Sequence, residues 1–157
     1  MAIVICNTPS CLIPKELFKE EKIHEYWNAL YATPLHHESI GKDELENFFL
    51  LYPSPKDIDS THEISFMYKS LREKFPDHFH AICINVHDTG LNLLALKDQH
   101  IIYTGYFHYS VKEDILYHLT NIFQQFFDNN IQVTFFYQQL SPPILRLLNN
   151  YYEMTKL

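Results

Sequence analysis

One segment constrains the fold more than the rest of the chain: residues 81–152 alternate strand-like and helix-like patterns, with short polar breaks between them. Apolar side chains at alternate positions, and runs of β-branched and aromatic residues, are typical of strands. These patterns predict three strands, over residues 81–86, 91–96 and 100–107. Because the breaks between them are short and polar or contain Gly, we expect three antiparallel neighbours.

A helix is predicted after the third strand. Ser110 and Glu113 have the spacing of a capping box, in which each side chain bonds an otherwise unpaired amide of the first turn. Apolar residues then recur every three or four positions as far as Phe126, which predicts one buried face. A strand over 131–137 and a last helix from Pro142 to Tyr152 complete the order β-β-β-α-β-α.

The N-terminal half has weaker patterns. They predict, in order, a strand at 2–6, a helix from Pro14 through Trp27, a strand at 45–52 that ends at Pro53-Ser54-Pro55, and a helix at 57–70. Phe75-Pro76-Asp77 interrupts both the apolar and the helical pattern. We therefore expect two domains, residues 1–75 and residues 76–157.

Charge and cysteine content exclude some classes of partner and compartment. Twelve Lys and Arg against 19 Asp and Glu give a net charge of −7 without any basic run, which disfavours nucleic acid and anionic membranes as partners. The cysteines are odd in number, and no apolar stretch is long enough for a membrane span. A cytoplasmic protein is expected.

The residues offer little catalytic or metal-binding chemistry. His78 and His80 would share one face of a strand, and His36-His37-Glu38 is a compact group of donors. Neither has a partner pair at a recognisable ligand spacing, so we expect no metal site. No Gly-x-Ser-x-Gly turn supports a nucleophile, and we expect no catalytic residues.

The strand and helix of residues 101–117 carry a resemblance to a known family. This segment contains Gly105-Tyr106-Phe107-His108-Tyr109 and the pair Glu113-Asp114, and a Tyr-rich last helix is expected later in the chain. It resembles the second lobe of an uncharacterised bacterial family, domain of unknown function 3822, whose members look like the actin-like ATPase fold. Residues 12–18 and Tyr52-Pro53 are similar to the family's first lobe.

The resemblance implies an α/β (α+β) fold built from actin-like, ribonuclease H-like lobes. Residues 1–75 would form an incomplete first lobe, and residues 76–157 a second lobe of order β-β-β-α-β-α with a mixed sheet. Actin-like ATPases hold phosphates at Gly-containing hairpin turns. By this resemblance Asp88, Thr89 and Gly90 would bind the cofactor Mg-ATP, with Asp88 facing Mg²⁺ through water.

The resemblance thus implies an alternative function, that of a nucleotide-binding protein or weak ATPase of the actin-like superfamily. Other interpretations of the same residues compete with it. The chain has only three glycines, and an Asp-x-Gly hairpin is more often only a hairpin, so we expect no cofactor. Ribonuclease H-type nucleases share the β-β-β-α-β order but need carboxylates, whereas the first strand offers Asn85 and residues 131–137 contain no acid.

A degenerate, non-catalytic actin-like domain is therefore expected, acting through a protein partner or self-association. An open edge at the strand over residues 2–6, or at its neighbouring strand, would favour such pairing. Candidate contact residues are Tyr103, Tyr106, Phe107, Tyr109, Tyr151 and Tyr152. The alternative is that most of these side chains are buried, and for any single one of them burial is the expected state.

Overall fold

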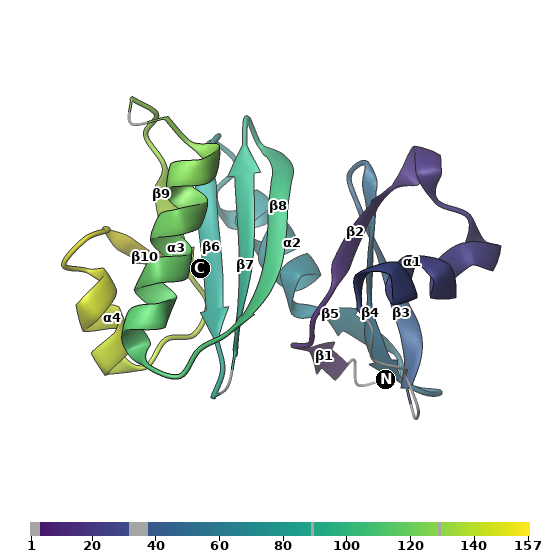
Figure 1. The fold of residues 1–157 in the computed structure, drawn as a ribbon. Coiled ribbons are helices and arrows are strands. Elements are labelled where there is room, and N and C mark those ends of the chain that lie inside the picture. Colours follow the sequence, from purple (N-terminus) through teal and green to yellow (C-terminus); the bar gives the residue numbers. More distant parts are fainter. Residues whose placement is uncertain (1–3, 32–37, 89, 129) are drawn as a thin grey trace. The chain divides into compact units, whose positions relative to one another are not determined.

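The chain divides into two compact units, residues 1–66 and residues 67–157, each with strands of its own (Figure 1). The computed structural model describes residues 4–31, 38–88, 90–128 and 130–157. The division lies inside helix α2 (Glu63–Lys74), earlier in the chain than the expected boundary after residue 75.

The second unit is built on a mixed five-stranded sheet in the order β10-β9-β6-β7-β8. Its strands are β6 (Ala81–Val86), β7 (Gly90–Lys97), β8 (His100–His108), β9 (Thr134–Tyr137) and β10 (Met154–Lys156). Strands β6, β7 and β8 are antiparallel neighbours, whereas β9 runs parallel to β6 and β10 parallel to β9. The three predicted strands and their pairing are confirmed.

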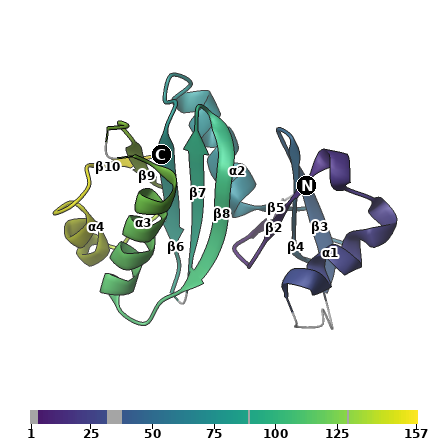
Figure 2. The ribbon, with the colours of Figure 1, turned by 45° about the horizontal axis from the view of Figure 1, so that its top comes forward.

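Helices cover both faces of this sheet. Side chains alternate between the two faces along each strand, so both faces carry side chains that the helices cover. One face packs against α3 (Lys112–Phe126) and α4 (Pro142–Leu148). On the other face, Cys83 Sγ lies 3.5 Å from Met67 Sδ of α2, and the Phe75 and Phe136 rings are 4.8 Å apart. Figures 1 and 2 show α2 and α3 on opposite sides of the sheet.

The core beneath α3 and α4 is apolar and closely packed. Its fully buried members come from alternate positions of β6 and β7 and from both helices: Ile82, Ile84, Leu91, Leu93, Ala95, Ile115, Leu119 and Leu148. Burial of each large side chain contributes about 1.5–3 kcal/mol before the entropy of ordering is counted. All six residues of β6 are buried, as expected for a strand covered on both faces.

The start of α3 differs in detail from the prediction. The helix begins at Lys112, so the third helical residue is Asp114 rather than Glu113. The Asp114 carboxylate accepts hydrogen bonds from the backbone amides of Ser110 and Val111, at 2.8 and 3.1 Å. These bonds hold the pKa of Asp114 below its usual value. The expected Ser110 and Glu113 box is thus replaced by a carboxylate one residue later.

The C-terminal prediction was wrong in length and missed a strand. Helix α4 ends at Leu148, and β9 covers only the second half of the predicted strand over 131–137. The Tyr152 ring stacks on Phe135 with centroids 4.3 Å apart, and its hydroxyl lies 2.7 Å from Thr120 Oγ1. This packing turns the chain back over the sheet, where β10 pairs with β9.

The first unit contains a three-stranded antiparallel sheet and a small parallel pair. The sheet has the order β2-β4-β3, and β1 pairs with β5. Its elements are β1 (Val4–Cys6), β2 (Cys11–Pro14), two 3-10 turns at Lys15–Leu17 and Glu20–Lys22, α1 (Ile23–Leu30), β3 (Glu38–Leu45), β4 (Phe48–Pro55) and β5 (Ser60–His62).

Several predictions for this unit were wrong. Pro14 ends a strand instead of opening a helix, β3 was missed, and α2 starts at Glu63 rather than near residue 57. Strand β4 continues through Pro55, past the expected stop. Because β2 pairs only with residues 48–51 of β4, the later part of β4 is paired on one side only among the described strands, and proline is tolerated there.

Candidate functional site

The hairpin between β6 and β7 is the site that the resemblance assigns to phosphate. Val86 and Leu91 are its last paired residues, and the His87 amide donates to the Gly90 carbonyl at 2.8 Å. Asp88 is exposed at its tip, and Thr89 lies outside the described residues. The assignment of Asp88, Thr89 and Gly90 to Mg-ATP stays a prediction.

Two tyrosines of the same unit, Tyr106 and Tyr109, contact this hairpin. The Tyr106 ring lies against Gly90 so closely that a Cβ added there would be 2.5 Å from Tyr106 Cζ. The Tyr109 hydroxyl donates to the His87 carbonyl oxygen. Burial raises the pKa of Tyr109, and the charge of Asp88 raises it further. The glycine is therefore required by the ring that packs on it.

The same packing recurs at the other two glycines. A Cβ at Gly41 would be 2.5 Å from Tyr52 Cε2, and one at Gly105 would be 2.7 Å from the Tyr103 hydroxyl. Among the described residues, positive φ angles occur at no glycine but at Glu46, Asp57, Asp98 and Gln99. The glycines of this chain thus make room for tyrosine rings over strands.

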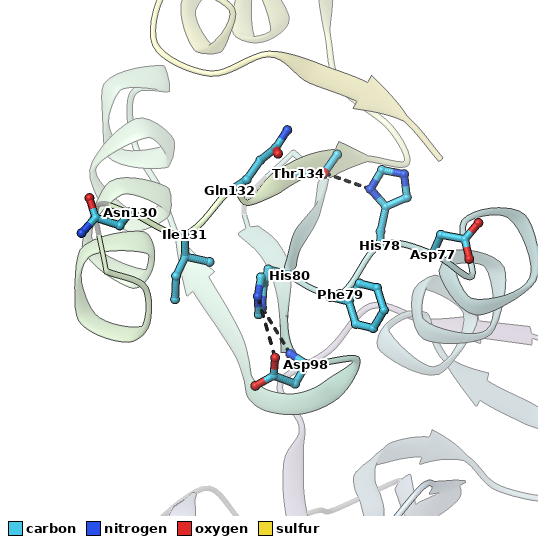
Figure 3. Close-up of a pocket in the computed structure, with 9 residues that line it drawn as sticks. All are labelled: Asp77, His78, Phe79, His80, Asp98, Asn130, Ile131, Gln132 and Thr134. Atoms are coloured by element: carbon cyan, nitrogen blue, oxygen red, sulfur yellow. Dashed lines mark hydrogen bonds and ion pairs between the residues drawn. The ribbon is translucent and has the colours of Figure 1, made fainter.

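A polar pocket of about 580 Å³ lies at the opposite end of the second unit's sheet (Figure 3). It is formed by the segment before β6, by the turn between β7 and β8, and by the segment leading into β9. The lining residues are Asp77, His78, Phe79, His80, Asp98, Asn130, Ile131, Gln132 and Thr134.

The two histidines of this pocket have separate partners. His80 Nδ1 accepts a hydrogen bond from the Asp98 amide at 3.2 Å, so neutral His80 carries its proton on Nε2, which lies 3.8 Å from Asp98 Oδ1. His78 Nδ1 lies 2.9 Å from Thr134 Oγ1. Figure 3 shows the rings directed toward these different partners. The expected pairing of His78 and His80 on one strand face is not observed, since both precede β6.

These contacts hold a strained turn. Asp98 and Gln99 both have positive φ, at 52° and 67°, which is unfavourable for residues other than glycine. The Gln99 amide donates to the Phe79 carbonyl at 2.8 Å, and Arg72 Nη1 donates to the Gln99 side chain at 2.5 Å. The pocket's polar groups therefore stabilise the turn between β7 and β8.

The chemistry of the pocket is limited. Two of its lining residues are carboxylates and none is Lys or Arg, which disfavours a phosphate ligand. The described residues contain no group of three His, Cys, Asp or Glu that could hold a metal ion. His36 and His37 lie outside the described residues, so the structure says nothing of the His36-His37-Glu38 donor group.

Buried amides are a feature that the sequence did not reveal. Asn85 of β6 and Asn92 of β7 are register partners, and both are almost fully buried. They lie on the face opposite α3, since their neighbours Ile84 and Leu93 face that helix. Asn85 Nδ2 donates to Gln138 Oε1 at 3.3 Å. The sequence signal that could have revealed these buried amides is one polar residue at the paired positions of two otherwise apolar strands.

Most of the candidate contact aromatics pack inside the second unit, as the alternative of burial expects. Tyr103 lies 5.3 Å from Phe126, and Phe107 stacks on His118 at 4.3 Å, both measured between ring centroids. Tyr109 and Tyr152 also pack against the core, whereas Tyr151 is 64% exposed.

Comparisons with solved structures identify the fold. The chain matches a Bacteroides thetaiotaomicron protein described as having an actin-like ATPase fold and unknown function, with a TM-score of 0.81 and 13% identity. The match covers 99% of this chain and 66% of that one, so this chain spans just under two thirds of its neighbour. The predicted actin-like fold is confirmed.

A second structure, the AlfA filament bound to AMPPNP, matches with a TM-score of 0.45 and 12% identity, over 98% of this chain and 51% of that one. Curated proteins give no match. The structure describes no helix long and apolar enough to cross a membrane. The model of the family described as protein of unknown function (DUF3822) matches residues 1–137, and the chain belongs to that family.

Proposed function

We propose that this protein is a non-catalytic member of the actin-like fold that acts through protein contacts and does not bind nucleotide. The observation that carries this proposal is the Tyr106 ring packed against Gly90. A phosphate turn needs glycine so that a ligand's oxygens reach the backbone amides. At Gly90 that space is taken by a side chain of the same unit.

The donors of the turn support the same proposal. The His87 amide already donates to the Gly90 carbonyl, and the neighbouring charge is the Asp88 carboxylate, which repels phosphate. The alternative function, Mg-ATP binding at Asp88, Thr89 and Gly90, has the fold in its favour, but a fold alone does not supply a site. The described residues of the turn do not fit the cofactor.

A nuclease role is also disfavoured by the residues at the corresponding places of the sheet. Two-metal hydrolysis needs carboxylates on neighbouring strands. Here the buried polar groups of β6 and β7 are the amides of Asn85 and Asn92, and Gln138 follows β9. Neutral amides are poor substitutes for carboxylates around two divalent cations.

The cysteines support a reducing compartment, the cytoplasm, as the place of action. Cys6, Cys11 and Cys83 are buried, and no disulfide joins any two of them. Burial raises the pKa of Cys11 to about 11, so its thiol stays protonated and unreactive at neutral pH.

Thermal unfolding of the full chain with Mg²⁺ and ATP, ADP or GTP tests the proposal. A nucleotide at a hundred times its dissociation constant would stabilise the fold by about 2.7 kcal/mol, a shift of several degrees. We expect no shift, with or without Mg²⁺. A Mg²⁺-dependent shift that disappears in Asp88→Ala would overturn the proposal and support nucleotide binding at this turn.

A further inference from the structure

The strand β8 forms the outer edge of the second unit's sheet. It is nine residues long, and within the described chain its ladder partner is β7. Its sequence, HIIYTGYFH, contains no Lys, Arg, Asp or Glu. Long edge strands without charge tend to pair with other strands. In the first unit, the edge strand β3 carries Lys42, Asp43 and Glu44.

Only part of β8 is regular enough to pair with another strand. The ladder joins Leu96 to Ile101 and Ala95 to Tyr103, so Ile102 is an extra residue, a bulge. From Tyr103 to His108 each residue has one partner on β7. A sixth strand added to this edge would therefore pair regularly with residues 103–108.

We infer that this edge pairs with β8 of a second copy of the same chain, in antiparallel orientation and centred on Gly105. The inference rests on the proposed function, which assigns the protein a role through protein contacts. In an antiparallel pair, the side chains of two residues directly opposite each other lie on the same face of the sheet. The twofold axis that relates the two copies must therefore pass next to a residue, because an axis next to a peptide bond would place side chains of different faces opposite each other. A centre at Gly105 keeps all five residues 103–107 in the regular segment.

The side chains of this register are complementary. Tyr103 would face Phe107 of the second copy, and Thr104 would face Tyr106 of the second copy. Within one copy, the Tyr103 and Phe107 rings already lie on either side of Gly105, nearly parallel and 6.4 Å apart. The two glycines would meet at the axis without side chains between them, surrounded by four aromatic rings. Cross-strand aromatic pairs of this kind are favourable.

Other centres fit less well. A centre at Thr104 would bring the Ile102 bulge into the ladder. A centre at Tyr106 would place two Tyr106 rings directly opposite each other, although each is held in place over its own Gly90. The Gly105 centre gives a closed twofold dimer with one continuous sheet, and its small area makes a weak, concentration-dependent dimer the expected form.

Sedimentation velocity of the full chain, from about 1 µM to about 1 mM, tests this inference across the range of weak dimers. We expect a monomer–dimer equilibrium that Thr104→Lys weakens at least about tenfold, because both copies then carry an edge lysine. The matched control is Thr155→Lys on β10, the opposite edge of the same sheet, which should leave the equilibrium unchanged.

Hydrogen exchange of the unmodified protein gives a second readout that does not depend on how the variants fold. Amides within residues 103–107 should become more protected as the concentration rises. A monomer at every concentration, or a dimer equally stable in Thr104→Lys, would overturn the inference. If the dimer inference fails in this way and nucleotide does not shift the melting temperature, the proposed function still holds, with a different protein as the partner. A nucleotide-induced shift overturns the proposed function itself.

Discussion

Acid should destabilise the first unit through one buried histidine, His62. Its side chain is fully buried, and both ring nitrogens are engaged. Nδ1 accepts a hydrogen bond from the Ile64 amide at 3.1 Å, at the start of α2, so the neutral ring carries its proton on Nε2. Nε2 donates to the Thr8 carbonyl at 2.8 Å. A second proton on Nδ1 would face the Ile64 N–H, and the Nδ1 hydrogen bond would be lost.

Burial lowers the pKa of His62 from its usual value of 6.5, and the Thr8 hydrogen bond opposes this only in part. The neutral form is therefore favoured in the folded state. Above pH 6.5 the folded and unfolded states bind the same number of protons at this site. Below it the unfolded state binds one more, so the free energy of unfolding falls with pH until the folded pKa is reached. At pH 5.5 this loss is at most about 1.4 kcal/mol, the limit for a group that stays neutral in the folded state.

Urea unfolding at pH 7.5 and 5.5, followed by tryptophan fluorescence, measures this loss. Trp27 is the chain's single tryptophan, and it is buried in the first unit, so its signal reports that unit. The control is His62→Asn, whose side-chain oxygen can still accept the Ile64 amide. We expect this variant to be about 1–3 kcal/mol less stable at pH 7.5, because the Thr8 carbonyl loses its donor.

The difference in stability between the two proteins should shrink at pH 5.5, by at most about 1.4 kcal/mol, because only the unmodified protein has the titrating group. If both proteins lose the same stability between pH 7.5 and 5.5, the titration of His62 is not responsible, and the reasoning from its burial fails.

Two further predictions concern the second unit. Asp114→Ala should lower the melting temperature of this unit at neutral pH, because the Ser110 and Val111 amides lose their acceptor. Since the pKa of Asp114 is lowered in the folded state, the difference from the unmodified protein should disappear as pH falls below 3.8 and through the folded pKa. A difference in melting temperature that persists in acid would contradict the capping role. Gly90→Ala should lower the free energy of unfolding by about 1–3 kcal/mol, because the added methyl group overpacks against Tyr106. Melts followed by circular dichroism should show a smaller loss of stability when Tyr106→Ala is also present, and equal losses would exclude the ring as the cause.

The elements that could be predicted from sequence are those whose pattern is local. Strand β6 and helix α3 each carry a full apolar period, and both were located within a residue or two. Strand β3, with the sequence ESIGKDEL, has no apolar alternation and is recognisable only through its pairing with β4. Strand β10 is three residues long and depends on β9 in the same way. Because β3 and β10 depend on pairing with other strands, neither has a local sequence pattern that predicts it.

The candidate site shows a second limit of sequence reasoning. Asp88 and Gly90 can be read from the sequence as a turn, and the fold places them between the first two strands of the lobe, where the resemblance expects a phosphate. The ring on which our proposal against nucleotide binding rests belongs to Tyr106, on the third strand. The contact between Tyr106 and Gly90 depends on the register of β7 and β8, which pairs Gly90 with His108 and Asn92 with Tyr106.

This dependence has a consequence for reading glycines in related sheets. A strand glycine leaves a gap that either a ligand or a neighbouring aromatic ring can fill, and the glycine alone does not distinguish the two. In this chain the register of β8 places an aromatic side chain at the gap beside Gly90, and Tyr103 and Tyr52 fill the corresponding gaps at Gly105 and Gly41. Tyrosine rings lie against all three glycines, which supports our proposal that no nucleotide binds here. The residue diagonally opposite a turn glycine, rather than the glycine, is then the position that separates a phosphate turn from a packed hairpin.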